Sequence, residues 1–430
     1  MRRAIDFVLA SAVVVVGLVA LVPLGLLLRL TRRGGPRRIV YLGTGQIAQV
    51  FPRNGVNLFL ERECSDFDGY FEQMWNVHFP AGTRGALSLT PRHHLVDVDF
   101  DVPGLDGLRR TAVAVREMCF LVWLLPFIWR TRATIVTATN PYLQGLNAAL
   151  VSRLLGIPFA VIITRDFDWD WDVLHKQAFA SVFPSRRVER AVGLWVLRQA
   201  HLVLADRNYY RAFAVRNGAR PERAVATRVL ADQAYATVHQ GSNVRARWGL
   251  AAGPLLVYVG RLDADKFSLD LVECLALVRQ SFPSAQLACA GTGGLEDEMR
   301  QRAAQAGSAD ALHLLGSIDL ADLPALIASS DVVVAPHMGY TLIEAGLTGV
   351  PIVTYDYDFH GEIVENGVSG LLVPFRDVPA LAAAVCRVLS EPDRGHEMGA
   401  RLRCKLLQEH SLEAVVPLYR AAYDMVLAAT

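Results

Sequence analysis

Residues 335–353 of this 430-residue chain read APHMGYTLIEAGLTGVPIV and contain a single carboxylate, Glu344. The stretch joins two short apolar runs, DVVVAP at 331–336 and PIVTYD at 351–356, which have the length and residue types of buried strands. Glycines stand at positions 339, 346 and 349, where they let the backbone approach a neighbour or a ligand closely. The lone acid is either a binding residue or an acid near a helix N-terminus, stabilised by the helix dipole.

The same alternation of apolar runs with helical sequence extends over most of the chain. Strands are predicted in two sets: RRIVYL, TIVTAT, FAVIIT and HLVLA in the first, and PLLVYVG, AQLACAG, ALHLLG, DVVVAP, PIVTYD and GLLVP in the second. This pattern is typical of parallel α/β sheets that are covered on both faces. It predicts domains at 37–240 and 241–408, followed by a C-terminal amphipathic helix at 409–430 that packs back on the first domain.

Composition narrows the class of protein. Hydrophobic residues make up 52% and charged residues 20%, as expected of a folded chain. The formal net charge of +1 argues against nucleic acid as a partner. The six cysteines form no CxxC pair, so reduced thiols in a cytoplasm are the simplest interpretation.

The N-terminal segment, 1–36, has a different character. Residues 7–28 contain no charge, and as a helix they would be roughly 33 Å long, enough to cross a hydrocarbon core. Arginines flank the segment on both sides, at positions 2 and 3 and more heavily from 29 to 38, and Pro23 lies within it. We therefore expect a retained membrane anchor that either spans or re-enters, with the remaining chain in the cytoplasm. The segment resembles the membrane helix of bacterial phosphoglycosyl transferases.

Two cations follow the predicted strand at 254–260. In VGRLDADK, Arg261 and Lys266 stand between Gly260 and a helix, at a strand end where open parallel sheets bind ligands. Cations beside a helix N-terminus suit a diphosphate. The alternative is two ordinary surface cations, but lysine occurs only three times in the chain.

These residues carry a resemblance to a known family. VGRLDADK, ACAGTGGLEDEM with Gly291 and the EAGLTGVPIV run resemble the donor-binding half of glycosyltransferase family 4, over roughly 254–425. The resemblance implies the GT-B fold, α/β with two Rossmann-like parallel-sheet domains facing across a cleft. It also implies a retaining enzyme that uses a nucleotide-diphosphate sugar and needs neither metal nor cofactor.

The resemblance also assigns roles to the opening stretch. Glu344 falls where the family binds the ribose hydroxyls of the donor, and a carboxylate can accept hydrogen bonds from both. Gly339, Tyr340 and Thr341 fall where the family presents backbone amides to the diphosphate and sugar. The family's first glutamate falls at Pro336, which has no carboxylate, so the transferred sugar is held differently, with His337 as a candidate, or activity is impaired.

The first domain offers weaker signals on the acceptor side. Alternating aspartates in ITRDFDWDWDV predict a loop at a strand end; a metal site is the alternative. The family resemblance implies that Arg165 and Asp166 lie near the reacting centre. Gly43-x-Gly45-x-x-Ala48 matches a dinucleotide fingerprint, with Glu61 or Glu63 as its acid. It favours either an acceptor-facing turn or a nicotinamide-dependent oxidoreductase. His78 is a candidate base by residue type alone.

The sequence thus predicts a glycosyltransferase of the cytoplasmic membrane. It would transfer a sugar from a nucleotide-diphosphate donor to a lipid-linked glycan acceptor in surface polysaccharide synthesis, with Arg261 and Lys266 neutralising the leaving diphosphate. The alternative is a non-catalytic GT-B scaffold that binds nucleotide or glycan at the membrane. Pro336 favours the scaffold, whereas the intact set of Arg261, Lys266 and Glu344 favours the enzyme.

Overall fold

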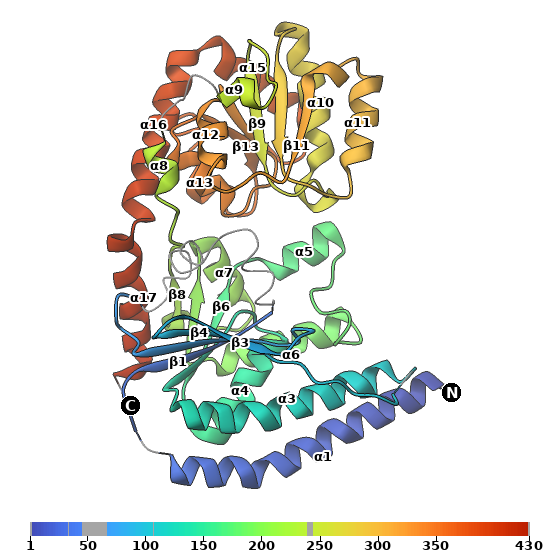
Figure 1. The fold of residues 1–430 in the computed structure, drawn as a ribbon, viewed down its shortest axis with the longest axis vertical. Helices are drawn as coiled ribbons and strands as arrows, with labels where there is room; N and C mark the ends of the chain where they lie inside the picture. The colour runs from blue at the N-terminus through green and yellow to red at the C-terminus, as the bar shows by residue number, and fades with distance from the viewer. Residues whose placement is uncertain (1, 33, 45–66, 106, 239–243, 429–430) are drawn as a thin grey trace. The chain divides into compact units, whose positions relative to one another are not determined.

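The structure is a computed structural model that describes residues 2–32, 34–44, 67–105, 107–238 and 244–428. The chain divides into two compact units, each built around its own sheet (Figure 1). Unit 1 comprises residues 1–228 and 416–430, and unit 2 comprises residues 229–415. Both units alternate strands with helices, as the apolar runs of the sequence predict.

Unit 1 contains an eight-stranded sheet in the order β3-β4-β2-β1-β5-β6-β7-β8. Every neighbouring pair is parallel except β3 with β4. The strand order reverses between β1 and β5, which makes this the topological switch point of a Rossmann-like sheet. The strands are β1 Arg38–Gly43, β2 Gln73–His78, β3 Gly85–Thr90, β4 His93–Asp97, β5 Ile135–Ala138, β6 Phe159–Ile163, β7 Leu202–Ala205 and β8 Ala224–Ala226.

The helices of unit 1 flank this sheet. Gly156 ends α4 in the left-handed conformation with φ of 65°, which favours glycine. The charge-free N-terminal segment lies within one long helix, α1. The helices are α1 Arg2–Thr31, α3 Arg109–Thr131, α4 Leu143–Leu155, α5 Phe167–Leu174, α6 Arg186–Gln199 and α7 Asn208–Arg216, with the 3₁₀ turn η1 Pro221–Arg223.

The loop predicted for the alternating aspartates is wrong, because most of this run forms α5. Asp166 is the N-cap, and its carboxylate accepts hydrogen bonds from the backbone N–H groups of Asp168 (2.9 Å) and Trp169 (3.1 Å). This capping satisfies donors that the first turn of a helix otherwise leaves unpaired. Helix formation therefore follows from the same aspartate that suggested a loop.

Unit 2 contains a six-stranded, fully parallel sheet in the order β11-β10-β9-β12-β13-β14. This is the strand order of a doubly wound Rossmann sheet, with its switch point between β9 and β12. All the strands predicted from residue 254 onward are present. They are β9 Leu255–Val259, β10 Gln286–Ala290, β11 Leu312–Gly316, β12 Val332–Ala335, β13 Ile352–Asp356 and β14 Leu371–Pro374.

Helices cover both faces of this second sheet (Figure 1). Those that follow the strand ends of the switch point are α10 Ser268–Ser281, preceded by the 3₁₀ turn η2 Ala264–Lys266, and α13 Thr341–Leu347. The others are α8 Ala234–Thr237, α9 Val244–Arg247, α11 Glu296–Gln305, α12 Leu323–Ala328, α14 His360–Ile363, α15 Val378–Ser390 and α16 Pro392–Glu409, with η3 Ala309–Ala311.

The predicted C-terminal helix is present as α17, Leu412–Leu427, and its last part belongs to unit 1. The hydroxyls of Tyr423 and Tyr41 lie 3.0 Å apart in the core of this unit, and burial raises the pKa of Tyr423 to about 12. Asp424 accepts hydrogen bonds from Arg37 (2.9 Å) and Tyr70 (2.8 Å). Polar and aromatic contacts thus tie the chain's last helix to its first strand.

We expect Tyr423→Phe to lower the free energy of unfolding by about 1–2 kcal/mol, because it removes a buried hydrogen bond of Tyr41. The double variant Tyr41→Phe/Tyr423→Phe is expected to lose no more than the single one, since it removes both partners together. Denaturant unfolding of the wild type, the two single variants and the double variant measures the coupling. Two independent, additive losses would contradict it.

Candidate functional site

The switch point of unit 2 places two loops beside each other. Strands β9 and β12 are parallel neighbours, with Val333 opposite Val257. The loops that follow them therefore leave the sheet at the same edge. Ligands of open α/β sheets bind at this carboxyl edge. The loop after β9 carries Arg261 and Lys266, and the loop after β12 carries His337, Gly339 and Tyr340 before α13 begins.

A second turn, after β10, packs directly on the loop after β9. Backbone hydrogen bonds of 3.0 Å run from Gly260 N to Ala290 O, from Leu262 N to Thr292 O and from Leu295 N to Leu262 O. The approach leaves no space for side chains: a Cβ at Gly291 would lie 1.9 Å from the carbonyl oxygen of Gly260. Gly291, the glycine singled out from the sequence, therefore serves to hold the β9 loop.

Arg261 is already paired within its own loop. Its guanidinium donates to the carboxylates of Asp263 and, at 2.7 Å, Asp265. Its backbone carbonyl accepts from the hydroxyl of Tyr258 (3.1 Å), which stays protonated because burial raises its pKa. The sequence pattern predicts a diphosphate partner for Arg261 and does not reveal these two acidic partners, although both stand in the VGRLDADK motif.

Lys266 ends the 3₁₀ turn that follows. Its backbone N–H donates to the carbonyl of Asp263 (3.0 Å), and its side chain is half-buried. The next residue, Phe267, adopts the left-handed conformation with φ of 53° and begins α10. This sharp turn fixes the position from which the Lys266 side chain extends.

His337 joins the two switch-point loops. Its Nδ1 lies 2.8 Å from the carbonyl oxygen of Asp265, so Nδ1 carries the hydrogen and Nε2 is the nitrogen that can accept one. The ring is 8% exposed and packs on Phe267 and Tyr357, with centroids 6.0 and 5.3 Å away. Pro336, directly before it, is buried. The aromatic partners had no signal in the sequence, because they come from separate loops.

Glu344 lies in the first turn of α13 and is 7% exposed. Its backbone N–H donates to the carbonyl of Tyr340 (3.2 Å), whose side chain is 46% exposed. A Cβ at Gly339 would meet nothing within 4 Å, so the backbone there borders open space. Thr341 begins the helix. Gly346, in contrast, is structural, since a Cβ there would lie 2.5 Å from Leu406 of α16.

Unit 1 has its own switch point, with two of the predicted acceptor-side residues. Gly43 ends β1, and a Cβ there would lie 3.8 Å from the ring of His78 at the end of β2. His78 is buried, and its Nδ1 lies 2.8 Å from the carboxylate of Asp97. The pair forms an imidazole–carboxylate unit in which Nε2 can accept a proton. Gly45, Ala48, Glu61 and Glu63 lie outside the described residues.

Arg165 and Asp166 follow β6, also at the carboxyl edge. Asp166 pairs with Arg216 (2.9 Å), while Asp168 pairs with Arg186 (2.8 Å) and Asp170 with Arg165 (3.2 Å). The carboxylates thus have separate cationic partners. In the part of the chain that the structure describes, no group of three or more His, Cys, Asp or Glu could hold a metal ion.

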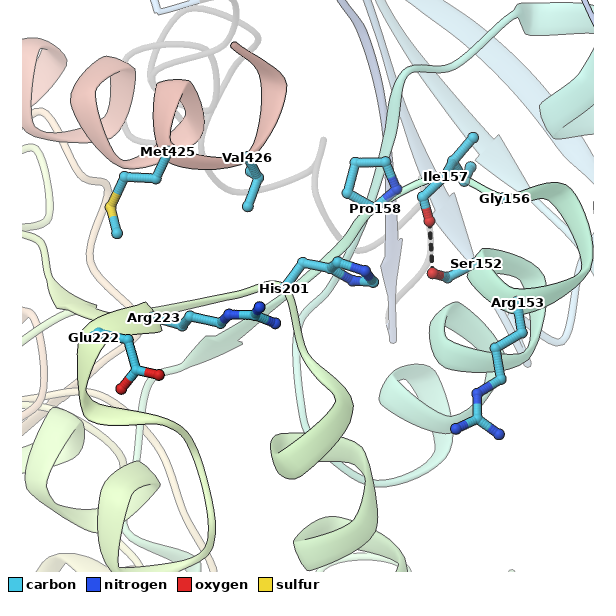
Figure 2. Close-up of a pocket in the computed structure, with 10 residues that line it drawn as sticks. All are labelled: Ser152, Arg153, Gly156, Ile157, Pro158, His201, Glu222, Arg223, Met425 and Val426. Atoms are coloured by element: carbon cyan, nitrogen blue, oxygen red, sulfur yellow. Dashed lines mark hydrogen bonds between the residues drawn. The ribbon is translucent and has the colours of Figure 1, made fainter. Parts of the chain in front are cut away.

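A hollow of about 680 Å³ lies on the opposite edge of the unit 1 sheet (Figure 2). Its lining includes Ile157 and Pro158 before β6, His201 before β7 and Arg223 before β8, so it opens at the amino edge of the sheet. The chemistry of open α/β sheets takes place at the other edge. We therefore place no catalytic function in this hollow.

Comparison with known proteins decides the class. The family model described as "Glycosyl transferases group 1" matches residues 244–403, which include Arg261, Gly291 and Glu344. An α-D-kanosaminyltransferase of Streptomyces kanamyceticus is 26% identical over 71% of this chain and 78% of its own length. The chain is a glycosyltransferase. The oxidoreductase suggested by Gly43-x-Gly45 is therefore wrong.

Two further likenesses help to define this glycosyltransferase. A GDP-mannose-dependent α-(1-6)-phosphatidylinositol monomannoside mannosyltransferase of Mycobacterium tuberculosis is 30% identical over 37% of the chain; the match spans less than half of that relative, 44%. The crystal structure of Anabaena HepE in complex with UDP-glucose has a TM-score of 0.69 at 17% identity, and the likeness covers 91% of this chain and all of that one. The fold is GT-B, as the sequence predicts.

Adjacent glycines of the glycosyltransferase test the packing of the two turns. A Cβ at Gly293 would lie 2.2 Å from the carbonyl oxygen of Leu262, whereas one at Gly294 would lie 3.8 Å from Asp263. We expect Gly293→Ala to lower the melting temperature by several degrees. The added methyl group would push the two turns apart, and such a backbone displacement lowers the free energy of unfolding by about 1–3 kcal/mol. Gly294→Ala is the matched control and should melt like the wild type. Equal melting temperatures for both variants would refute the close approach.

Proposed function

We propose that this glycosyltransferase transfers a sugar from a nucleoside-diphosphate donor to an acceptor hydroxyl with retention of configuration, as a member of glycosyltransferase family 4. The switch point of unit 2 is the observation that carries this proposal. It presents a cation pair, a glycine-held turn and a buried carboxylate at one carboxyl edge. The UDP-glucose complex of HepE and the GDP-mannose dependence of the mannosyltransferase support this donor class.

Arg261 and Lys266 bind and neutralise the diphosphate in this proposal. Negative charge grows on the leaving diphosphate as the bond to the sugar breaks, so fixed cations there stabilise the transition state. Asp263 and Asp265 hold the guanidinium of Arg261 in place. When the donor binds, its phosphates replace these carboxylates as hydrogen-bond partners of Arg261. The guanidinium is already oriented, so two of its N–H groups can donate to the phosphates together.

Glu344 accepts hydrogen bonds from the ribose hydroxyls, and Gly339, Tyr340 and Thr341 face the phosphates and sugar with their backbone amides. The open space at Gly339 and the burial of Glu344 support these roles. A buried carboxylate binds vicinal hydroxyls more strongly than an exposed one, because water competes less.

His337 takes over the sugar contact that Pro336 cannot make. Its Nδ1 donates to the carbonyl of Asp265, so Nε2 is the ring nitrogen that can accept a hydrogen bond from a sugar hydroxyl in this proposal. Retention then needs no carboxylate at position 336 if the departing diphosphate accepts the proton of the acceptor hydroxyl as the new glycosidic bond forms. Gly43, Gly45, His78, Arg165 and Asp166 belong to the acceptor side of this proposal.

The acceptor is a lipid-linked glycan of a bacterial surface polysaccharide, with the enzyme on the cytoplasmic membrane and its α/β domains in the cytoplasm. Support comes from the apolar helix at 5–31, which is long enough to cross a membrane, and from the phosphatidylinositol mannoside named in the mannosyltransferase relative. The second apolar helix, Arg109–Thr131, is instead a core helix, because Leu121, Leu124 and Leu125 are fully buried.

Lys266→Ala and Arg261→Ala are expected to raise the dissociation constant for the nucleoside diphosphate by about 10- to 150-fold, the equivalent of about 1.5–3 kcal/mol for a lost charged hydrogen bond. Calorimetric titration with UDP, GDP and ADP measures the affinity and identifies the base. Arg300→Ala, which removes an exposed cation of α11, is the control and should bind as the wild type does. Unchanged affinity in both test variants would remove the diphosphate assignment.

Glu344→Gln is expected to abolish discrimination between a ribonucleoside diphosphate and its 2′,3′-dideoxy analogue. The wild type should prefer the ribonucleotide by about tenfold or more, since a hydrogen bond to a charged group contributes about 1.5–3 kcal/mol. Glu298→Gln on α11 is the matched control. If Glu344→Gln keeps the full preference, the carboxylate does not bind the ribose.

A further inference from the structure

Helix α1 packs lengthwise against unit 1. It runs side by side with α3 (Figure 1), and the two are parallel, since residues near the start of α1 meet the start of α3. Two glycines allow the close approach: a Cβ at Gly17 would lie 2.5 Å from Met118 of α3, and one at Gly25 would lie 2.8 Å from Leu154 of α4. Small residues serve the same purpose where apolar helices cross in membranes.

A carboxylate fastens the start of α1 to this surface. Asp6 is 8% exposed and accepts hydrogen bonds from the backbone N–H groups of Arg110 (3.1 Å) and Thr111 (3.0 Å) and from the Thr111 hydroxyl (2.8 Å). These N–H groups open α3, whose own N-cap residue, Leu108, provides no side-chain hydrogen bond. Asp6 thus caps a neighbouring helix, and the first turn of α3 depends on it.

Two arginines hold the other end. The guanidinium of Arg32 donates to the carbonyl of Ala133, just beyond α3, at 2.6 Å. Arg29 lies against Gly156, where a Cβ would come within 2.7 Å of its Nε. Both ends of α1 are therefore tied to the same domain, in which Phe127 of α3 packs edge-on against Trp75 of β2, with ring centroids 6.4 Å apart.

The outward face of α1 remains uncovered. Only 6% of its most apolar window is buried, although the mean hydropathy of that window is 2.8. Its large apolar side chains there include Val8, Val16, Val19 (68% exposed), Leu26 and Leu30. An exposed apolar face of this extent marks a surface for a membrane or a partner.

A groove of about 820 Å³ continues this face between α1 and α3. Its ten lining residues include Val13, Val16, Val115, Met118 and Val122, and none of the ten carries a charge. Exposed arginines stand at both ends of the helix pair instead, with Arg109 and Arg110 at one end and Arg29 at the other. Cations at the ends and hydrocarbon between them complement a phospholipid surface.

We propose that α1 does not cross the membrane but lies parallel to it, within one leaflet of an anionic phospholipid bilayer, with acyl chains covering its outward face and filling the α1–α3 groove. The inference rests on the proposed membrane association and settles its geometry. A helix in this position needs a polar side, and α1 has none of its own. The side of α1 that faces away from the membrane is covered by α3 and α4 of unit 1, so α1 can be apolar all round.

Depth measurements on the full chain in liposomes of phosphatidylcholine and phosphatidylglycerol test the geometry. Nitroxide labels are placed on single cysteines at Val8, Val19 or Leu30, with the native cysteines replaced, and their depth is read from collision with oxygen and a nickel chelate. Val8 and Leu30 are about 33 Å apart along the axis. We expect three depths that agree within about 5–10 Å, all in one leaflet.

A deep label at Val19 with shallow labels at Val8 and Leu30 would show a spanning helix and overturn the in-plane geometry, while membrane association stands. Failure of the wild type to float with liposomes would overturn the membrane association itself. Labels shielded from both collision reagents would mean that protein covers the face, which also overturns the proposal. Nucleoside-diphosphate affinity, measured on each variant, verifies that unit 2 is folded.

Asp6→Ala tests whether Asp6 fastens the start of α1 to α3. The matched control is Asp101→Ala, which removes an exposed acid before α3. Loss of the cap should change the depth and increase the mobility of the label at Val8, while the label at Leu30 keeps its depth. The control should leave both labels unchanged. A Val8 label that is insensitive to Asp6→Ala would contradict the fastening of α1 by Asp6.

Discussion

The donor half of the molecule depends on one close approach of backbone to backbone, between the turns that follow β9 and β10. Three hydrogen bonds join them, and the space between them excludes even a methyl group at Gly291 or Gly293. Because the two turns cannot separate without losing these bonds, the loop that carries Arg261 and Lys266 has a fixed path. Preorganised charge of this kind is what stabilises a leaving group.

The charges of this loop are balanced within the loop itself. Arg261 stands between Asp263 and Asp265, and the carbonyl of Asp265 in turn holds His337. One short segment therefore orients both the cation proposed for the diphosphate and the imidazole proposed for the sugar. In the proposed donor complex the phosphates would exchange with these carboxylates as partners of a guanidinium that the acids keep in position.

Unit 1 combines a Rossmann-like sheet with an apolar covering that the sheet does not require. Helix α3 packs on α1 and contacts β2 through the rings of Phe127 and Trp75. The cap that Asp6 places on α3 links the N-terminal segment to the same domain that contains the His78–Asp97 pair. A lipid-linked acceptor in the same leaflet would then meet a domain whose orientation to the membrane is fixed. This would lower the entropic cost of bringing the acceptor into the reactive geometry.

The sequence by itself determined most of the strands and their parallel arrangement in two Rossmann-like sheets, because short apolar runs are local signals; strands β2, β3, β4 and β8 were not predicted. The glycosyltransferase class followed from the resemblance of its motifs to a known family. The sequence also placed Arg261, Gly291 and His337 at the carboxyl edge, since strand ends can be read from the chain. Only the tertiary structure decided the partners of these groups. Arg261 paired with acids of its own motif, Asp166 capped a helix where a loop was expected, and Asp6 capped a helix more than one hundred residues away. Hydrogen bonds between distant segments depend on how the chain packs, and no periodicity or spacing encodes them.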